Sequence, residues 1–208
     1  MKFNRFARTA SQLLFLALFI VLYLKGKTQA WMMVFALGIV VSFFAGRWYC
    51  GWACQMGTLL RGISWLKRTL KIPQIKAPAV AKKPLFRIVS FIILFAAMFI
   101  MQKNGLQRYA ILGMTGLSVL VTLFFHESFW HASLCPYGSI LSVTTRASRL
   151  KVSVSEDACI ACGKCQTACP TVTVRKADSG KWKVTKSDCL NCGQCMDACP
   201  VNAIKYGA

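Results

Sequence analysis

The sequence predicts an α-helical membrane bundle of four transmembrane helices, followed by a small α+β module at the C-terminus. Two observations predict this architecture. Hydrophobic residues make up 56% and charged residues only 15% of the 208-residue chain, far from the composition of a soluble protein. Eight of the eleven cysteines fall into two tight runs near the C-terminus. The chain therefore divides into an apolar first part and a cysteine-dense last part.

Four apolar segments account for the membrane part, which we place at residues 1–138. They cover residues 10–24, 30–46, 85–101 and 109–125. Each is near the short end of the about 20 residues that span a bilayer as a helix. The alternative is that one pair is re-entrant or interfacial. Because the first segment lacks a small-residue cleavage site, we interpret it as an uncleaved anchor.

The distribution of Lys and Arg predicts the orientation of these segments. The stretch from Gly46 to Arg87, which joins the second and third segments, carries nine basic residues, whereas the other two links carry four. Because positively charged loops stay in the cytoplasm, we expect this connection and both termini there, in the inner membrane of a prokaryote. The nine are Arg47, Arg61, Lys67, Arg68, Lys71, Lys76, Lys82, Lys83 and Arg87, and the four are Lys25, Lys27, Lys103 and Arg108.

Smaller elements are predicted in the connections. Residues 59–70 have apolar side chains at helical spacing with basic ones between them, which is typical of a helix on lipid headgroups. This pattern breaks at Pro73 and Pro78. Residues 139–154, rich in Ser, Thr and Arg, are interpreted as a linker. Residues 172–175 and 181–186 flank a turn and predict a short hairpin.

The two cysteine runs repeat one pattern at an interval of about 30 residues. Cys-x-x-Cys-x-x-Cys-x-x-x-Cys-Pro begins at Cys159 and again at Cys189. Two-residue gaps let three thiolates of one loop reach three irons of a cube, and the fourth cysteine of each run ligates the other cube. Residues 155–208 are therefore predicted to be a ferredoxin-like α+β domain with two [4Fe–4S] clusters. Cluster 1 is assigned to Cys159, Cys162, Cys165 and Cys199, and cluster 2 to Cys189, Cys192, Cys195 and Cys169.

Three other classes of protein fit less well. Structural zinc sites do not need the third and fourth cysteines at these spacings, and a disulfide framework belongs to secreted proteins. The formal charge of +20 would usually suggest nucleic acid. However, many basic residues lie beside apolar segments, where they meet lipid headgroups, and two clusters lower the charge to roughly +16. We therefore expect no nucleic-acid partner.

Three further cysteines follow the second and fourth apolar segments, at the expected cytoplasmic edge of the membrane. Cys50 and Cys54 are four positions apart, as are His131 and Cys135. That spacing places two side chains on one face of a helical turn, and two such turns brought together offer four soft ligands. These four residues are a candidate third iron–sulfur centre.

Other interpretations of the same residues are open. In one interpretation, Cys50 and Cys54 form a redox-active thiol pair or only pack the bundle, and His131 is an interfacial histidine. In another, all four residues bind copper or another metal. Haem is not expected, because His126 has no second histidine at a suitable depth and no Cys-x-x-Cys-His motif occurs. No residue is assigned a catalytic role.

Aromatic residues surround these cysteines in the sequence. They could line a quinone pocket, with Arg47 donating to a quinone carbonyl, or form the interfacial belt found in membrane proteins generally. The aromatic residues are Trp48, Tyr49, Trp52, Phe129 and Trp130.

Taken together, the four segments, the two interfacial motifs and the two-cluster tail resemble the NapH-type membrane polyferredoxins, with NosR and FixG/CcoG-type proteins as relatives. The resemblance implies electron transfer between the quinone pool, or a cytoplasmic donor, and a partner complex. Alternatives are a quinol dehydrogenase and a copper-handling assembly factor. The family pattern is Cys-x3-Cys-Pro twice, and this chain departs from it at Gln55, which replaces a proline, and at His131, which replaces a cysteine.

Overall fold

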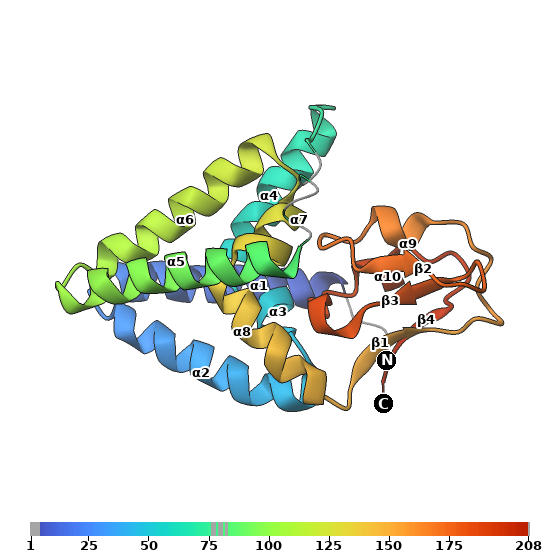
Figure 1. Cartoon of the computed structure of the whole chain (residues 1–208), viewed down its shortest axis with the longest axis horizontal. Helices are drawn as coiled ribbons and strands as arrows, with labels where there is room; N and C mark the ends of the chain where they lie inside the picture. The colour runs from blue at the N-terminus through green and yellow to red at the C-terminus, as the bar shows by residue number, and fades with distance from the viewer. Residues whose placement is uncertain (1–4, 76–77, 79–80, 82, 208) are drawn as a thin grey trace. The chain divides into compact units, whose positions relative to one another are not determined.

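Four long helices confirm the four predicted apolar segments in the computed structural model, which describes residues 5–75, 78, 81 and 83–207 (Figure 1). Each has 18 to 20 residues and is apolar enough to cross a membrane. They start one to five residues earlier than predicted, because residues just before each apolar run, such as Arg5, Thr28 and Pro84, join the first helical turn. The helices are α1 (Arg5–Leu24), α2 (Thr28–Ala45), α5 (Pro84–Lys103) and α6 (Gln107–Phe124).

The chain forms two compact units. The cysteine unit comprises Met1–Leu13, Phe35–Ala53 and Leu141–Ala208, and the helical unit comprises Leu14–Val34 and Cys54–Ile140. This division differs from the predicted boundaries at residues 138 and 155, which stay a prediction. It arises because the start of α1 and the end of α2 contact the cysteine-rich segment.

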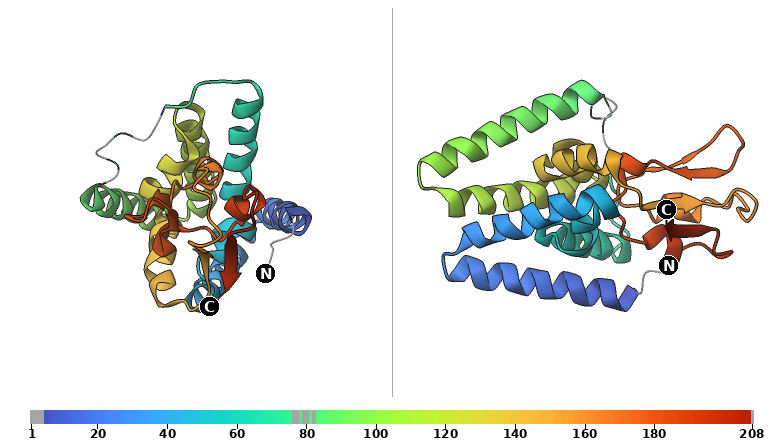
Figure 2. Two further views of the ribbon diagram at one scale, coloured as in Figure 1. Left: turned by 90° about the vertical axis from the view of Figure 1, so that its right-hand side faces the viewer. Right: turned by 90° about the horizontal axis from the view of Figure 1, so that it is seen from below.

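In the helical unit, two tight turns join the long helices in pairs. Gly26 follows α1 with φ of +73°, and Gly105 follows α5 with φ of +71°. Glycine adopts this left-handed conformation without the steric cost that a Cβ brings, and it commonly ends helices. Helices α5 and α6 pack as an antiparallel pair, which can be followed in Figure 2.

Helix α4 (Gln55–Thr69) confirms the helix predicted over residues 59–70. It starts four residues earlier than predicted and ends before Pro73. It packs along α6, where the buried Lys67 ammonium donates to the carbonyl oxygens of Thr122 (3.0 Å) and Leu123 (2.9 Å). A cation at the C-terminal end of α6 compensates the unpaired carbonyls there. The predicted location of α4 on lipid headgroups stays a prediction.

The chain after α6 consists of short helical pieces. They are α7 (Glu127–Phe129), the π-helix η2 (Trp130–Leu134) and α8 (Pro136–Thr144). One hydrophobic core holds η2 against α4 and α6, and its buried members are Met56, Leu60, Met114, Trp130 and Cys135.

The cysteine unit contains the short helix α3 (Trp48–Trp52) and two small antiparallel sheets. Strand β1 (Lys151–Val154) pairs with β4 (Ile204–Gly207), so Val152 faces Tyr206. Strand β2 (Val174–Lys176) pairs with β3 (Trp182–Val184), which confirms the predicted hairpin.

The remaining elements of this unit are the helical turns η3 (Thr145–Ala147) and η4 (Lys186–Asp188) and the helices α9 (Lys164–Thr167) and α10 (Gln194–Asp197). The predicted linker, residues 139–154, is therefore not irregular throughout. It contains the end of α8, η3 and strand β1. The alternating Lys-Val-Ser-Val sequence of β1 suits a strand with one buried and one exposed face.

Candidate iron–sulfur centres

Eight cysteines of the cysteine unit line two cavities, four cysteines in each. The first cavity is lined by Cys159, Cys162, Cys165 and Cys199. The second cavity is lined by Cys169, Cys189, Cys192 and Cys195. The fourth cysteine of each run thus lies with the first three of the other run. This is the grouping that the spacing predicts, whereas ligation by each thiol stays a prediction.

The same backbone conformation recurs in both cysteine loops. Ala161 and Asn191 have φ of 56° and 49°, and Gly163 and Gly193 have φ of 77° and 72°. Left-handed residues turn the chain tightly, so consecutive thiols and backbone N–H groups can converge on one point. Gly163 and Gly193 then cap α9 and α10 at their N-termini. The sequence repeat is therefore also a structural repeat.

The electrostatics of these thiols fit an iron-containing group. Burial raises the pKa of the Cys189 thiol to about 12 and raises the pKa of Cys195 further. Backbone N–H groups of Trp182 and Ala161 instead lower the pKa of Cys159. Four thiols crowded into a buried space ionise together only if positive charge compensates them, and an iron core supplies that charge. The donor sets therefore suit [4Fe–4S] clusters.

Helix α3 lies directly on the loop of the second cavity. The indole N–H of Trp52 donates to the carbonyl oxygen of Asn191 at 3.1 Å. A Cβ added at Gly51 would overlap the carbonyl oxygen of Leu190, so the two backbones are in close contact there. The second cavity is therefore attached to the segment that follows α2.

The start of α1 contacts the same region. The Arg8 guanidinium donates to the carbonyl oxygen of Cys192 and pairs with the Asp197 carboxylate at 3.2 Å. One turn later, the Gln12 amide donates to the carbonyl oxygen of Gly51 at 2.6 Å. These buried polar side chains explain why the first residues of α1 belong to the cysteine unit.

Arg47, between α2 and α3, is completely buried. Its Nη1 atom is 3.8 Å from Oδ1 of Asp188, and its Nη2 atom is 3.9 Å from Sγ of Cys50. The charge of Arg47 also reaches Cys189, where it partly opposes the rise of the thiol pKa. A buried cation thus lies beside the second cavity.

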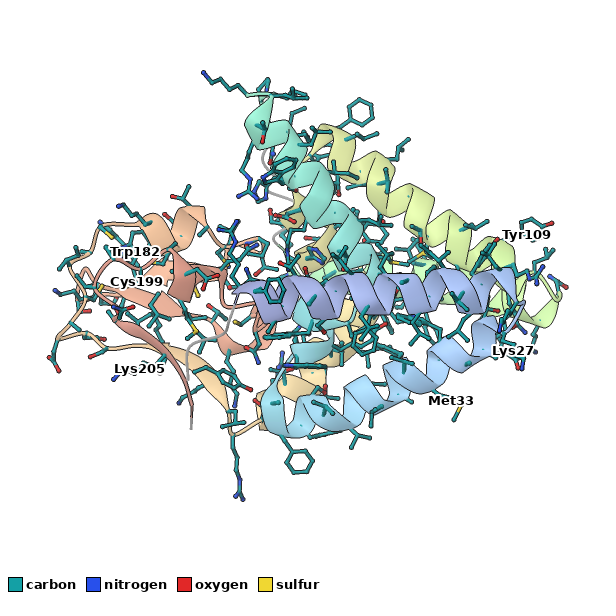
Figure 3. All side chains as sticks on the ribbon, turned by 180° about the vertical axis from the view of Figure 1, so that it is seen from behind. Lys27, Met33, Tyr109, Trp182, Cys199 and Lys205 are labelled. Atoms are coloured by element: carbon teal, nitrogen blue, oxygen red, sulfur yellow. The ribbon has the colours of Figure 1, made fainter. Side chains whose placement is uncertain are left out.

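The first cavity has a more exposed edge. Cys162 is exposed, and the side chains of Ile160 and Val201, which also line the cavity, are 59% and 40% exposed. Trp182 and Cys199 line the same cavity and are labelled in Figure 3. This edge offers an apolar surface close to cluster 1.

The four interfacial candidates do not lie as the spacing predicts. Cys50 is inside α3, but the N–H of Ala53 bonds back to the carbonyl oxygen of Tyr49 and α3 ends at Trp52. Cys54 then has extended backbone with ψ of 116° before α4 begins. The prediction that Cys50 and Cys54 share one helical turn is therefore wrong, because the helix breaks between them.

Cys54 and Cys135 occupy matching places in the helical unit. Each has extended backbone immediately before a helix, α4 or α8. The N–H of Gly138 donates to Sγ of Cys135 at 3.4 Å. Both thiols lie near Tyr137, whose pKa is raised mainly by burial and further by the charges of Cys135 and Cys54. His131 is buried in η2, four residues before Cys135.

Within the described part of the chain, no three His, Cys, Asp or Glu side chains are placed to hold a single metal ion. The eight cysteines of the two cavities also form no single-ion site. This is expected for cluster ligands, because sulfurs around a four-iron cube lie farther apart than sulfurs around one ion. Among the described residues, no site for a single ion such as copper is therefore formed. A third iron–sulfur centre stays a prediction.

The aromatic residues considered for a quinone pocket take part in packing. Trp48 stacks on Trp52 with ring centroids 5.6 Å apart. Phe129 stacks on Phe86, also in the helical unit, at 6.3 Å, and Trp130 is completely buried. His126, considered as a haem ligand, accepts a hydrogen bond from the Ser128 N–H at the start of α7. The quinone pocket stays a prediction.

Sequence reasoning missed one buried charged group. Glu127 is 4% exposed, and burial raises its pKa to about 7 although the charges of Arg61 and Arg68 on α4 act in the opposite direction. The signal was present in the sequence, since Glu127 is the only acidic residue before position 156. A single carboxyl group among many basic residues is expected to have a specific structural role.

Two family models match the chain. A 4Fe-4S dicluster domain matches residues 152–206, and a 4Fe-4S binding domain matches residues 27–73 and 107–155. The second match contains all four interfacial candidates. No solved structure matches the chain.

The chain is also similar to curated proteins. It is 30% identical over 138 residues to an uncharacterized protein of Methanocaldococcus jannaschii, covering 64% of this chain and 55% of that protein. The ferredoxin-type protein NapH of Haemophilus influenzae is 26% identical, with 67% and 54% covered. The methylamine utilization ferredoxin-type protein MauN of Methylorubrum extorquens is 25% identical, with 70% and 56% covered. The chain spans about half the length of these relatives.

The helices, the two cysteine-lined cavities and these matches define a membrane protein of the ferredoxin type that binds two [4Fe–4S] clusters. By sequence it is similar to the ferredoxin-type proteins NapH and MauN.

Proposed function

We propose that this chain is a membrane-anchored electron-transfer subunit that passes electrons between the quinone pool, or a cytoplasmic donor, and a partner redox complex. Each [4Fe–4S] cluster, when bound, exchanges one electron at a time. The cysteines hold the two clusters side by side, and the surrounding apolar side chains limit the access of water. The protein supplies position and electrostatics, and no side chain needs to act as a catalyst.

One observation carries this proposal. The eight cysteines divide four and four around two cavities, and the loop of the second cavity is bonded to α3 through Trp52 and Asn191. Helix α3 directly follows α2, one of the four candidate spans. A two-cluster carrier attached to the end of a membrane helix suits transfer between the membrane and a protein partner.

We propose further that Cys50, Cys54, His131 and Cys135 hold a third iron–sulfur centre at the cytoplasmic edge of the membrane. Its support is the 4Fe-4S binding domain match over both motifs and the approach of Cys54 and Cys135 to Tyr137. Cys54→Ala should then lower the iron content of full-length protein while both ferredoxin clusters stay intact. His131→Cys should keep the iron and lower the potential of this centre, because thiolate donates more charge than imidazole.

Anaerobic mixing of the full-length protein with reduced quinol tests the transfer role. Reduction of the clusters by quinol alone would indicate a quinol dehydrogenase. Reduction only when co-purifying subunits are present would indicate a conduit inside a complex. Clusters that exchange electrons with neither quinol nor co-purifying subunits would contradict the proposed function.

A further inference from the structure

Arg47 carries a buried positive charge that its protein surroundings compensate only loosely. Its side chain is 0% exposed, and the nearest carboxylate, that of Asp188, is 3.8 Å away. Its Nε and Nη1 atoms donate no hydrogen bond to any residue in the part of the chain that the structure describes. A buried guanidinium in this state is stable only if further negative charge lies close to it.

The second cavity supplies that negative charge. Asp188 is adjacent in sequence to Cys189, and α3, which begins next to Arg47, packs on Leu190 and Asn191. Four thiolates around an iron core give a net negative centre at this place. The cavity and the cation are therefore held together by the contacts that attach α3 to the cysteine loop.

Among the described residues, the first cavity has no completely buried cation that corresponds to Arg47. The cations near it are Lys181, whose ammonium donates to the carbonyl oxygen of Cys159 at 2.5 Å, and the exposed Lys176, whose Nζ atom lies 6.0 Å from the ring centroid of Trp182. Lys181 is only partly buried, so solvent screens its charge more than that of Arg47. The two clusters are therefore expected in unequal electrostatic surroundings.

We propose that Arg47 raises the reduction potential of cluster 2 relative to cluster 1. Reduction by one electron adds one negative charge at the second cavity, while the guanidinium keeps its proton in both states. A fixed cation in a buried environment favours the more negative state. A higher potential makes cluster 2, which is attached to α3, the better electron acceptor. The value of this difference for electron transfer rests on the proposed function.

The test is a mediated redox titration of full-length protein, followed by electron paramagnetic resonance. Arg47→Gln should lower one of the two midpoint potentials, and that cluster should be the one that Cys189→Ser perturbs. Arg47→Lys should restore much of the shift because it keeps the charge. Asp188→Asn removes the counter-charge and should move the same midpoint upward, which keeps the test available if Arg47→Gln loses its clusters.

Lys205→Gln is the matched control, since it makes the same change of charge at an exposed position of the cysteine unit (labelled in Figure 3). It should leave the difference between the two potentials unchanged. Unchanged potentials in Arg47→Gln and Asp188→Asn with full iron content, or equal shifts of both clusters, would overturn the inference. Because mediators supply the electrons, the outcome does not depend on whether quinol or a partner reduces the protein.

Discussion

The indole N–H of Trp52 donates to the backbone carbonyl of Asn191 at 3.1 Å, joining residues 139 positions apart. Asn191 lies between Cys189 and Cys192, and its side-chain amide also donates to the carbonyl oxygen of Ala45, the last residue of α2. The loop of the second cavity is thus bonded to α3 through Trp52 and to the last residue of α2, one of the four candidate spans.

Gly51→Ala tests the close approach of α3 to this loop. Alanine normally stabilises a helix relative to glycine by about 0.5–1 kcal/mol. At position 51, however, the new Cβ would overlap the carbonyl oxygen of Leu190. We therefore expect a loss of stability of about 1–3 kcal/mol and a weaker signal from cluster 2, measured by thermal unfolding in detergent and by electron paramagnetic resonance.

The matched control for this change is Gly62→Ala in α4, where a Cβ meets nothing within 4 Å. It should be neutral or stabilising. If both variants behaved alike, α3 would not be packed against the loop as described.

Cys199→Ser tests the exchange of the fourth ligand between the two runs. Cys199 lines the first cavity with Cys159, Cys162 and Cys165. The substitution should therefore alter cluster 1 and leave cluster 2 intact, whereas Cys169→Ser should do the reverse. Site-resolved spectra would decide the matter, and damage confined to the cluster of the same run would sink the assignment.

The sequence predicted more of the cysteine unit than of the interface, for physical reasons. Cluster-binding loops are local, so the spacing from Cys159 to Cys169 largely determines their shape, and the pairing of β2 with β3 follows from a short turn. The break after Trp52 depends on α3 packing against a loop 139 positions away. Spacing alone therefore suggested one continuous helical turn through Cys50 and Cys54, and long-range contacts produced a different result.

Glu127 should make stability depend on pH. Its pKa is raised from 4.5 to about 7, so the folded state binds the proton more tightly than the unfolded state. The resulting stabilisation is fully present below about pH 4.5 and is lost as the pH rises through about 7, with an upper limit of about 3 kcal/mol.

Glu127→Gln should remove this part of the pH dependence. The unfolding midpoint of the wild type in detergent should fall more between about pH 5 and about pH 8 than that of the variant. The neighbouring His126 works in the opposite sense, because burial lowers its pKa and costs stability in acid. It is present in both proteins, so their difference isolates Glu127. Parallel pH profiles would show that the carboxyl group is ionised throughout.

The distribution of basic residues predicts the orientation of the chain. Reporter fusions after Ala208 and within residues 76–83 should be cytoplasmic, whereas fusions at Lys27 and Lys103 should be external. Two of the basic residues in the connection between α2 and α5, Lys76 and Lys82, lie outside the described residues. Opposite locations for the first two fusions would mean that an odd number of spans separates them.

The number of clusters tests the account most directly. Full-length protein purified without oxygen should contain two [4Fe–4S] clusters in the cysteine unit, that is, about eight irons and eight sulfides in addition to any interfacial centre. Reduction with dithionite should give the resonance of two neighbouring [4Fe–4S] clusters, and Cys159→Ser and Cys189→Ser should each remove or alter one. Zinc in place of iron, or only one cluster in protein with all eight cysteines intact, would contradict the account.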